Sequence, residues 1–369
     1  MNRNVIPWQH VILAAAFLAL AAFVYFFCTA DMQSQRAIKV GLVLPPQRAE
    51  QKWYQEATTG LQDATQEIGA SLLVEENVPD DWRGMDAIDR LHKEGAGVIV
   101  SSGYGYGELF RAAGQTYPTT DFYTIMPYRN EGNVRTYFVR IYQLRYLQGM
   151  LAGMKTKTGR IGFLSYPRVP DNVQELDAFA LGVRRVNPDA RVFATFLPLP
   201  SGPDYDPEAD AIAATERLVK NAGVDVLASH RENDAVSEYA IANGIDTLAS
   251  YDDLPDDPHL LSRQSIDWKM VWSELLKDDI RRSNPRAFYW FGFDRAGMKF
   301  TIVSPDVTPE ERARIEQAEA SFGRGFEPFS GLIRDNEGNI RCREDESVSD
   351  LQLRQSINWL VEGVIVYEE

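Results

Sequence analysis

The residues of this chain that are able to perform chemistry do not form a catalytic set. The 369 residues include four histidines, and neither a G-x-S-x-G nucleophile turn nor an H-E-x-x-H zinc motif occurs among them. We therefore expect a protein that binds a small molecule without transforming it. The candidate ligand-binding residues stand beside expected strands and helices: Trp53, Tyr54, Gly103, Tyr104, His230, Asp234 and Asp252.

A glycine-rich segment, Gly103 to Gly107, follows an expected strand and opens an expected helix. Glycines at such a place let backbone amides approach a ligand at the N-terminus of the helix. A dinucleotide fingerprint has a further glycine and follows the first strand of its domain, whereas this GxGxG segment follows the third strand. We expect a ligand-contact loop that includes Gly103 and Tyr104, with a plain tight turn as the alternative.

Polar side chains follow two strands of the second half of the chain. His230 ends one strand and precedes Asp234, and Asp252 comes after the strand that contains residues 247–249. Open α/β sheets place ligand groups at the carboxyl ends of their strands, so all three are candidate contacts. The alternatives are a solvated loop histidine and a turn or helix-capping role for Asp252.

Trp53 and Tyr54 are adjacent aromatic residues near the start of the first expected helix, which spans residues 51–68. Core packing accounts for one of them on a helix with a single apolar face. We expect the other to face outward or into a cleft.

The first thirty residues are predicted to be a targeting segment. A short basic start at Arg3 precedes an unbroken apolar run over residues 11–27. The run is slightly shorter than the roughly 20 apolar residues of a full membrane span. The alternatives are therefore a cleaved signal peptide and a retained membrane anchor, with lipidation at Cys28 as a third. We expect residues 31–369 to lie in the periplasm or cell envelope.

Charge and cysteine content exclude several classes of partner. The chain has 53 acidic and 38 basic residues and a formal charge of −15, which disfavours nucleic acid as a partner. Beyond the leader only Cys342 remains, so neither an intramolecular disulfide nor a cysteine-based metal site is expected. We expect no metal and no cofactor.

The chain after residue 38 alternates β-branched runs with amphipathic helical stretches, and this rhythm restarts near Arg160. Alternation of this kind indicates α/β structure with parallel sheets covered on both faces. We predict two doubly wound lobes joined by a hinge with three crossings, near 142–156, near Ser262 and further on. Lobe 1 is expected over about 38–145 with part of 265–369, and lobe 2 over about 159–262 with C-terminal returns.

The order of motifs resembles the basic membrane protein family, the substrate-binding proteins of ABC importers for purine nucleosides and related bases. The resemblance covers about 38–362 and implies a periplasmic-binding fold of type 1. It is most specific in these stretches: Asn133, Tyr146–Gly149, Lys155–Phe163, Asn187–Asp189, Pro328–Asp335 and Asn358–Val364.

The resemblance also implies roles for single residues. The family's base-stacking aromatic residue falls on Trp53, its glycine loop on Gly103 and Tyr104, and its ribose-binding aspartate on Asp252. Trp268 is retained near the third crossing. Two departures affect the ligand: the first-loop aspartate pair is replaced by Ala49 and Glu50, and the expected lysine or tryptophan is replaced by Ser265 and Ile266.

The function expected from these features is the capture of a purine-like ligand between two lobes for an ABC permease. A membrane-anchored sensor of the same fold, which reports to a membrane partner, is the first alternative. A Rossmann-type enzyme is the second alternative, although no acid–base or nucleophile set supports it.

Overall fold

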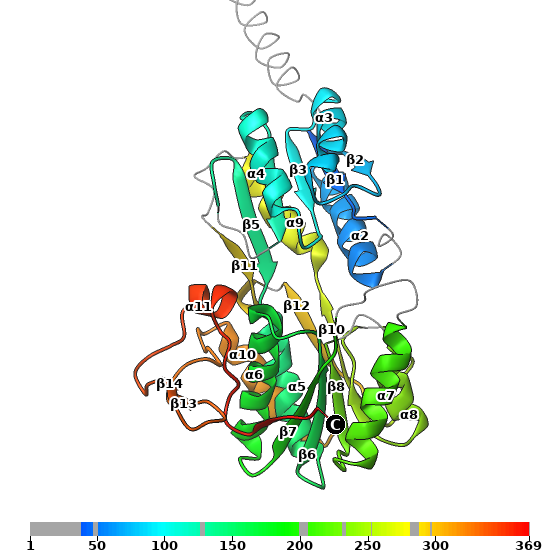
Figure 1. Cartoon of the computed structure of the whole chain (residues 1–369), viewed down its shortest axis with the longest axis vertical. Coiled ribbons are helices and arrows are strands. Elements are labelled where there is room, and N and C mark those ends of the chain that lie inside the picture. The colour runs from blue at the N-terminus through cyan, green and yellow to red at the C-terminus, as the bar shows by residue number, and fades with distance from the viewer. Residues whose placement is uncertain are drawn as a thin grey trace, which may run out of the picture.

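The computed structural model has two lobes, each a β-sheet covered by helices on both faces, arranged along the long axis of the molecule (Figure 1). Within the part of the chain that is described, no helix is both long and apolar enough to cross a bilayer. The expected leader lies outside this part. The described residues are 38–46, 51–125, 130–198, 206–230, 234–251, 253–280, 288–295 and 297–368.

Lobe 1 is built on a six-stranded parallel sheet with the order β11-β5-β4-β3-β1-β2. Its strands are β1 (Lys39–Val43), β2 (Ser71–Glu75), β3 (Val98–Ser101), β4 (Asp121–Ile125), β5 (Val134–Val139) and β11 (Tyr289–Phe291). Its helical elements are α2 (Lys52–Glu67), η1 (Trp82–Gly84), α3 (Met85–Lys93), α4 (Gly107–Thr116) and α9 (Trp268–Ile280).

Helices on both faces bury the sheet of lobe 1, so its central strands are continuous apolar runs rather than alternating ones. All four residues of β3 are buried. On one face α2 packs against α9, and Nε1 of Trp272 donates a hydrogen bond of 2.8 Å to the carbonyl oxygen of Ala57. On the other face, Ile88 of α3 and Phe110 of α4 belong to a separate buried cluster.

Lobe 2 is built on a seven-stranded sheet with the order β12-β10-β9-β8-β6-β7-β15, parallel except for β12 against β10. Its strands are β6 (Arg160–Ser165), β7 (Arg191–Phe196), β8 (Val226–Ser229), β9 (Asp246–Leu248), β10 (Leu260–Ile266), β12 (Met298–Ile302) and β15 (Val364–Val366). Its helices are α5 (Ile141–Lys155), α6 (Pro170–Val186), α7 (Pro207–Lys220), α8 (Ala235–Ala242) and α10 (Pro309–Phe322).

The C-terminal segment between α10 and β15 adds a small hairpin and one short helix to lobe 2. Its elements are β13 (Ile333–Arg334), β14 (Ile340–Cys342) and α11 (Asp350–Gln355), and the third crossing contains the short turn η2 (Phe293–Arg295). Ser349 caps α11 by accepting a hydrogen bond from the amide of Gln352, whose side chain bonds back to Ser349, a capping box readable in the sequence.

The predicted α/β class with parallel sheets is confirmed.

Two glycines set the packing of lobe 2, because they let α5 and α6 approach at backbone distance. A Cβ atom placed on Gly149 of α5 would overlap the carbonyl oxygen of Phe179, and one placed on Gly182 of α6 would overlap that of Tyr146. Each of these glycines faces the backbone of the other helix. Any side chain at either position therefore separates the helices.

Three connections join the lobes, at Arg140, at Asp267 and over residues 292–297. The first two lie at different residues from the expected crossings: α5 already belongs to lobe 2 from Ile141, and β10 continues past Ser262 to Ile266. β10 extends this far because its ladder with β12 pairs Ile266 with Met298.

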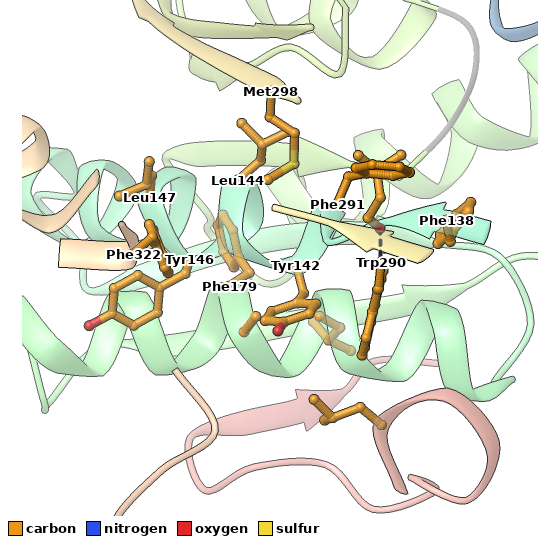
Figure 2. Packing of buried hydrophobic residues seen from close by; sticks show 14 of the residues in the cluster. Phe138, Tyr142, Leu144, Tyr146, Leu147, Phe179, Trp290, Phe291, Met298 and Phe322 are labelled. Atoms are coloured by element: carbon orange, nitrogen blue, oxygen red, sulfur yellow. Dashed lines mark hydrogen bonds between the residues drawn. The ribbon is translucent and has the colours of Figure 1, made fainter. Parts of the chain in front are cut away.

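Hydrogen bonds and aromatic packing hold the three connections side by side. The amide of Arg140 donates to the carbonyl oxygen of Phe291 at 2.6 Å, and the amide of Asp267 donates to that of Gly297 at 3.0 Å. Figure 2 shows Phe138, Trp290 and Phe291 of lobe 1 beside Tyr142 and Met298 of lobe 2 in one buried cluster. The junction between the lobes is thus an apolar core crossed by short backbone links.

Replacing Gly182 with alanine is expected to lower the free energy of unfolding by at least about 1–3 kcal/mol, since the new methyl group meets backbone rather than a flexible side chain. Urea denaturation followed by circular dichroism measures the change. Gly97→Ala is the matched control, because Gly97 has open space at its Cβ position, and its effect should stay within about 0.5 kcal/mol. Equal stability of the two variants would contradict the close helix contact.

Candidate functional site

A cavity of about 80 Å³ lies where the two lobes meet and collects polar and aromatic side chains from both. A larger groove of about 310 Å³ lies on the flank of lobe 2, over α5 and α10, and receives no residue from lobe 1. The cavity between the lobes is the candidate site because side chains of both lobes line it. Its lining residues are Trp53, Glu56, Tyr104, Ile141, Leu144, Arg145, Tyr166, Glu175, His230, Ser250, Tyr251, Gln264, Ser265 and Ile266.

Trp53 forms the aromatic wall on the side of lobe 1, and its ring is held in place by three contacts. Its Nε1 donates a hydrogen bond of 2.7 Å to the carbonyl oxygen of Ser102. Its ring meets that of Trp268 edge-on at 4.8 Å between centroids and lies 6.1 Å from that of Phe138. Trp53 is 9% exposed and lines the cavity, so these contacts hold the part of its ring that a ligand meets.

The glycine-rich loop after β3 is fixed beside Trp53. The hydroxyl of Tyr137 donates to the carbonyl oxygen of Ser101 at 2.9 Å, and the amide of Gly103 donates to the Ser101 hydroxyl at 3.1 Å. A Cβ atom at Gly103 would lie 2.9 Å from the ring of Tyr106, so glycine is required there by packing. The loop leaves Tyr104 48% exposed at the cavity, edge-on to Phe138.

A buried cluster of charged groups forms the wall on the side of lobe 2. Nε of Arg145 on α5 donates a hydrogen bond of 2.9 Å to Oε2 of Glu175 on α6. Nδ1 of His230, at the end of β8, lies 3.0 Å from the same oxygen. Burial acts to raise the pKa of Glu175, but His230 and Arg145 outweigh it and hold that pKa below its usual range. Glu175 is therefore an ionised, compensated carboxylate.

Arg145 and its neighbour Gln148 also tie α5 to the segment that follows β9. Nη1 donates to Oε1 of Gln148 at 2.8 Å, and both Nη atoms lie 3.4 Å from the hydroxyl of Ser250. Gln148 in turn donates from Nε2 to the carbonyl oxygen of Ala249 at 2.9 Å. The cationic side chain is thus satisfied by several partners while 2% exposed.

An ion pair crosses between the lobes at the edge of the cavity. Lys52 of α2 pairs with Asp253 of lobe 2, and its Nζ lies 4.6 Å from the ring centre of Tyr251. Partial burial and the neighbouring carboxylate of Asp253 raise the pKa of Asp234 to about 6, although Lys52 acts in the opposite direction. These groups form a charged latch, Lys52 with Asp253 and Asp234, whose members come from both lobes.

Trp53, Tyr104 and His230, three of the residues expected from the sequence, line the cavity. They reach it from α2, from the loop after β3 and from the end of β8, positions far apart in the chain. The structure brings them together because the carboxyl ends of the strands in both sheets face the junction of the lobes (Figure 1).

The other expected residues have different places. Tyr54 packs in the core of lobe 1 and is 4% exposed, because it faces the sheet from α2. Trp268 supports Trp53 from behind, Gly103 shapes the loop under Tyr104, and Asp234 belongs to the latch. Asp252 lies outside the described residues, as do Ala49 and Glu50.

Arg145, Glu175 and Gln264 line the cavity and were missed by the sequence analysis. A signal for Arg145 was present, because it is a charged residue within a helix that is otherwise mostly apolar. A charge on the buried face of a helix needs a buried partner. The sequence does not identify that partner, since Arg145 and Glu175 are 30 residues apart.

Two lobes with parallel sheets, three short connections and a polar cavity at the junction define a solute-binding protein of the periplasmic type. The model of the family described as ABC transporter substrate-binding protein PnrA-like matches residues 37–262. The chain belongs to this family, as its sequence motifs indicated.

Relatives and solved structures agree with this assignment. A purine-binding protein of Brucella abortus is 24% identical over 94% of this chain and 98% of its own length. A glucose-binding protein of an ABC transporter from Haloferax volcanii is 28% identical over 72% of this chain and 65% of its own length.

The solved structures show the same fold at low sequence identity. A transcriptional activator of the comK gene from Bacillus halodurans has a TM-score of 0.68 at 19% identity, covering 77% of this chain and 97% of its own. An ABC transporter solute-binding protein from Conexibacter woesei has a TM-score of 0.62 at 18% identity, covering 78% and 97%. The predicted periplasmic-binding fold of type 1 is thereby confirmed.

Asp234 is expected to make stability depend on pH. Because its folded pKa of about 6 lies above the ordinary value of 3.8, its contribution is fully present below about pH 4 and is lost as the pH rises through 6. Asp234→Asn should therefore change the unfolding free energy little at pH 4 and remove part of the decline between pH 4 and pH 7. Denaturant titrations of both proteins across this range measure the difference, and parallel curves would refute the raised pKa.

Proposed function

We propose that this protein captures a purine base or nucleoside in the cavity between its lobes and presents the closed form to an ABC permease. The observation that carries the proposal is the pairing of an aromatic wall on lobe 1, Trp53 and Tyr104, with a charged wall on lobe 2, formed by Arg145, Glu175 and His230. A flat ligand with polar edges is complementary to both walls.

The two walls contribute different parts of the binding free energy. Stacking of a base on an aromatic ring is worth about 1–3 kcal/mol and tolerates any flat heterocycle. Hydrogen bonds from groups that are already held in place add selectivity, because they favour ligands whose polar atoms lie in matching positions. Asp252 stays a proposed contact for ligand hydroxyl or N–H groups.

The names of the two relatives support a purine and leave a sugar as the second ligand class to test. The Brucella abortus relative, which matches nearly the whole chain, is named for purine binding. The Haloferax volcanii relative, which matches a smaller share, is named for glucose binding. The replacement of the family's aspartate pair by Ala49 and Glu50 supports a free base or an unusual nucleoside as a ligand beside an ordinary purine nucleoside.

Closure of the lobes about the three connections is the proposed response to ligand. The connections are short and bonded to one another, at Arg140 with Phe291 and at Asp267 with Gly297, so they bend together. The latch between Lys52 and Asp253 joins the lobes on the cavity side. Ligand that contacts both walls stabilises the same closed arrangement.

Solute-binding proteins of ABC importers act outside the cytoplasm, and they bind solutes rather than transform them. For this chain we propose that residues 1–30 deliver the binding region across the membrane, either as a cleaved signal or as an anchor. The basic start and the apolar run over residues 11–27 support this delivery.

A sensor is the second candidate function. A transcriptional activator of Bacillus subtilis, 25% identical over 51% of this chain and 57% of its own length, favours it, because that relative is named for regulation rather than import. Uptake of labelled ligand separates the two roles. Deleting an import receptor abolishes high-affinity uptake, whereas deleting a sensor leaves uptake intact and changes gene expression.

Trp53→Ala is expected to weaken binding of adenine, guanine, adenosine and guanosine by roughly 10- to 100-fold, since the stacking surface is lost. Trp53→Phe keeps a flat ring against Trp268 and should stay within about tenfold of the wild type. Calorimetry measures the affinities, and thermal melting shows whether each variant is folded. Retained purine binding by a folded Trp53→Ala protein, or binding of glucose in place of every purine, would refute the proposal.

Lobe closure should reduce the radius of gyration when ligand is added, and small-angle scattering measures it. Lys52→Met removes the ion pair with Asp253, which is worth at most about 1 kcal/mol at this exposure. The radius of gyration of the ligand-free variant should therefore be slightly larger than that of the wild type. Saturating ligand should bring both proteins to the same compact size. An unchanged radius in both would argue against a hinge mechanism.

A further inference from the structure

Gln264 is a buried amide for which the described part of the chain supplies no hydrogen-bond partner. Its side chain lines the cavity and the residue is 6% exposed. Its Oε1 is fully buried and accepts no hydrogen bond, and no side-chain bond joins its Nε2 to any described residue. Most buried polar groups are paired, and an unpaired amide costs about 1–3 kcal/mol.

The backbone holds Gln264 at the junction of the lobes. It lies in β10, the last strand before the second connection, and pairs with Phe300 of β12 in the ladder. Gln264, Ser265 and Ile266 are the last three residues of β10, and all three line the cavity. The amide therefore has a fixed position at the point about which the lobes move.

Glu175 and Trp53, two other polar residues of the cavity, already have protein partners. Glu175 accepts from Arg145 and lies against His230, and Nε1 of Trp53 donates to the backbone of Ser102. A ligand therefore meets satisfied groups on these walls and an unsatisfied carboxamide at Gln264. At Gln264 a hydrogen bond to the ligand therefore satisfies a buried oxygen that has no partner among the described residues.

We propose that Gln264 selects the ligand by a paired hydrogen bond, in which a ligand N–H donates to Oε1 and an adjacent ligand acceptor receives Nε2–H. The inference rests on the proposed function and deepens it. The ligand class is a purine whose edge carries a donor beside an acceptor: the exocyclic amine with a ring nitrogen in adenine, or the ring N–H with the carbonyl in a 6-oxopurine. Glutamine forms this two-bond pair with adenine in nucleic-acid recognition.

A carboxamide differs in this respect from the carboxylates that a binding cleft also uses. An ionised carboxylate only accepts, so it binds hydroxyl and amine donors alike, whereas the amide needs one donor and one acceptor in register. Gln264 thus discriminates between flat heterocycles of equal size that Trp53 stacks equally well. Specificity and affinity are divided between the two residues.

The test compares ligands and variants in one thermodynamic cycle on the full chain in detergent micelles. The ligands are adenine, hypoxanthine and 6-methylpurine, which keeps the shape of adenine and lacks the exocyclic N–H donor beside the ring nitrogen. The variants are Gln264→Met, which preserves length and removes the amide, and Gln264→Glu, which preserves an acceptor. Gln317→Met, in the flank groove over α10, is the control.

The wild type is expected to bind adenine roughly 10- to 100-fold more tightly than 6-methylpurine, and Gln264→Met should remove most of that preference. Gln264→Glu should lose affinity for adenine by a smaller factor, and Gln317→Met should behave as wild type. Calorimetry gives the affinities and thermal melting reports folding.

Each possible failure has a distinct signature. Equal binding of adenine and 6-methylpurine by the wild type overturns the role of Gln264 while the purine function stands, and this comparison does not depend on any variant being folded. A folded Gln264→Met protein that keeps the full preference overturns it as well. If the folded wild type binds none of the three purines, the proposed function itself fails.

Discussion

The close contact of α5 with α6 is the constraint on which the site depends. Gly149 and Gly182 each face the backbone of the other helix, so the helix axes lie nearer than side chains would allow. This approach brings Arg145 within 2.9 Å of Glu175 in a buried position. Since α5 begins at the first connection between the lobes, the same contact also fixes where lobe 1 is attached.

A buried ion pair is costly unless its geometry and its further hydrogen bonds offset the loss of water. Here Glu175 has both Arg145 and His230 within 3.0 Å, and Arg145 has additional bonds to Gln148 and Ser250. Removing one member would leave an uncompensated charge, at a cost of about 3–5 kcal/mol. We therefore interpret the cluster as a rigid polar wall that orients a ligand. The charge of Glu175 is already offset by its protein partners before a ligand binds.

The junction of the lobes combines stiffness with a capacity for bending. Its apolar core continues from lobe 1 into lobe 2 through Phe138, Tyr142 and Trp290, whose Nε1 donates to the carbonyl oxygen of Val139 (Figure 2). Only short backbone links cross this core, so rotation of one lobe on the other changes few dihedral angles. The proposed ligand groups lie on both sides of these links, Trp53 on one and Gln264 on the other, so a ligand that contacts both would couple binding to the proposed closure.

The sequence by itself determined the α/β class, the family and the aromatic and histidine positions at strand ends, because hydrophobic periodicity and ordered motifs are local properties of a chain. Only the tertiary structure decided which of them share a cavity. Tyr54 and Trp53 are neighbours in sequence, but their directions from α2 send one into the core and the other to the cavity. Arg145, Glu175 and Gln264 were not predictable as a set, since pairing and burial arise from contacts between distant segments and leave no local pattern.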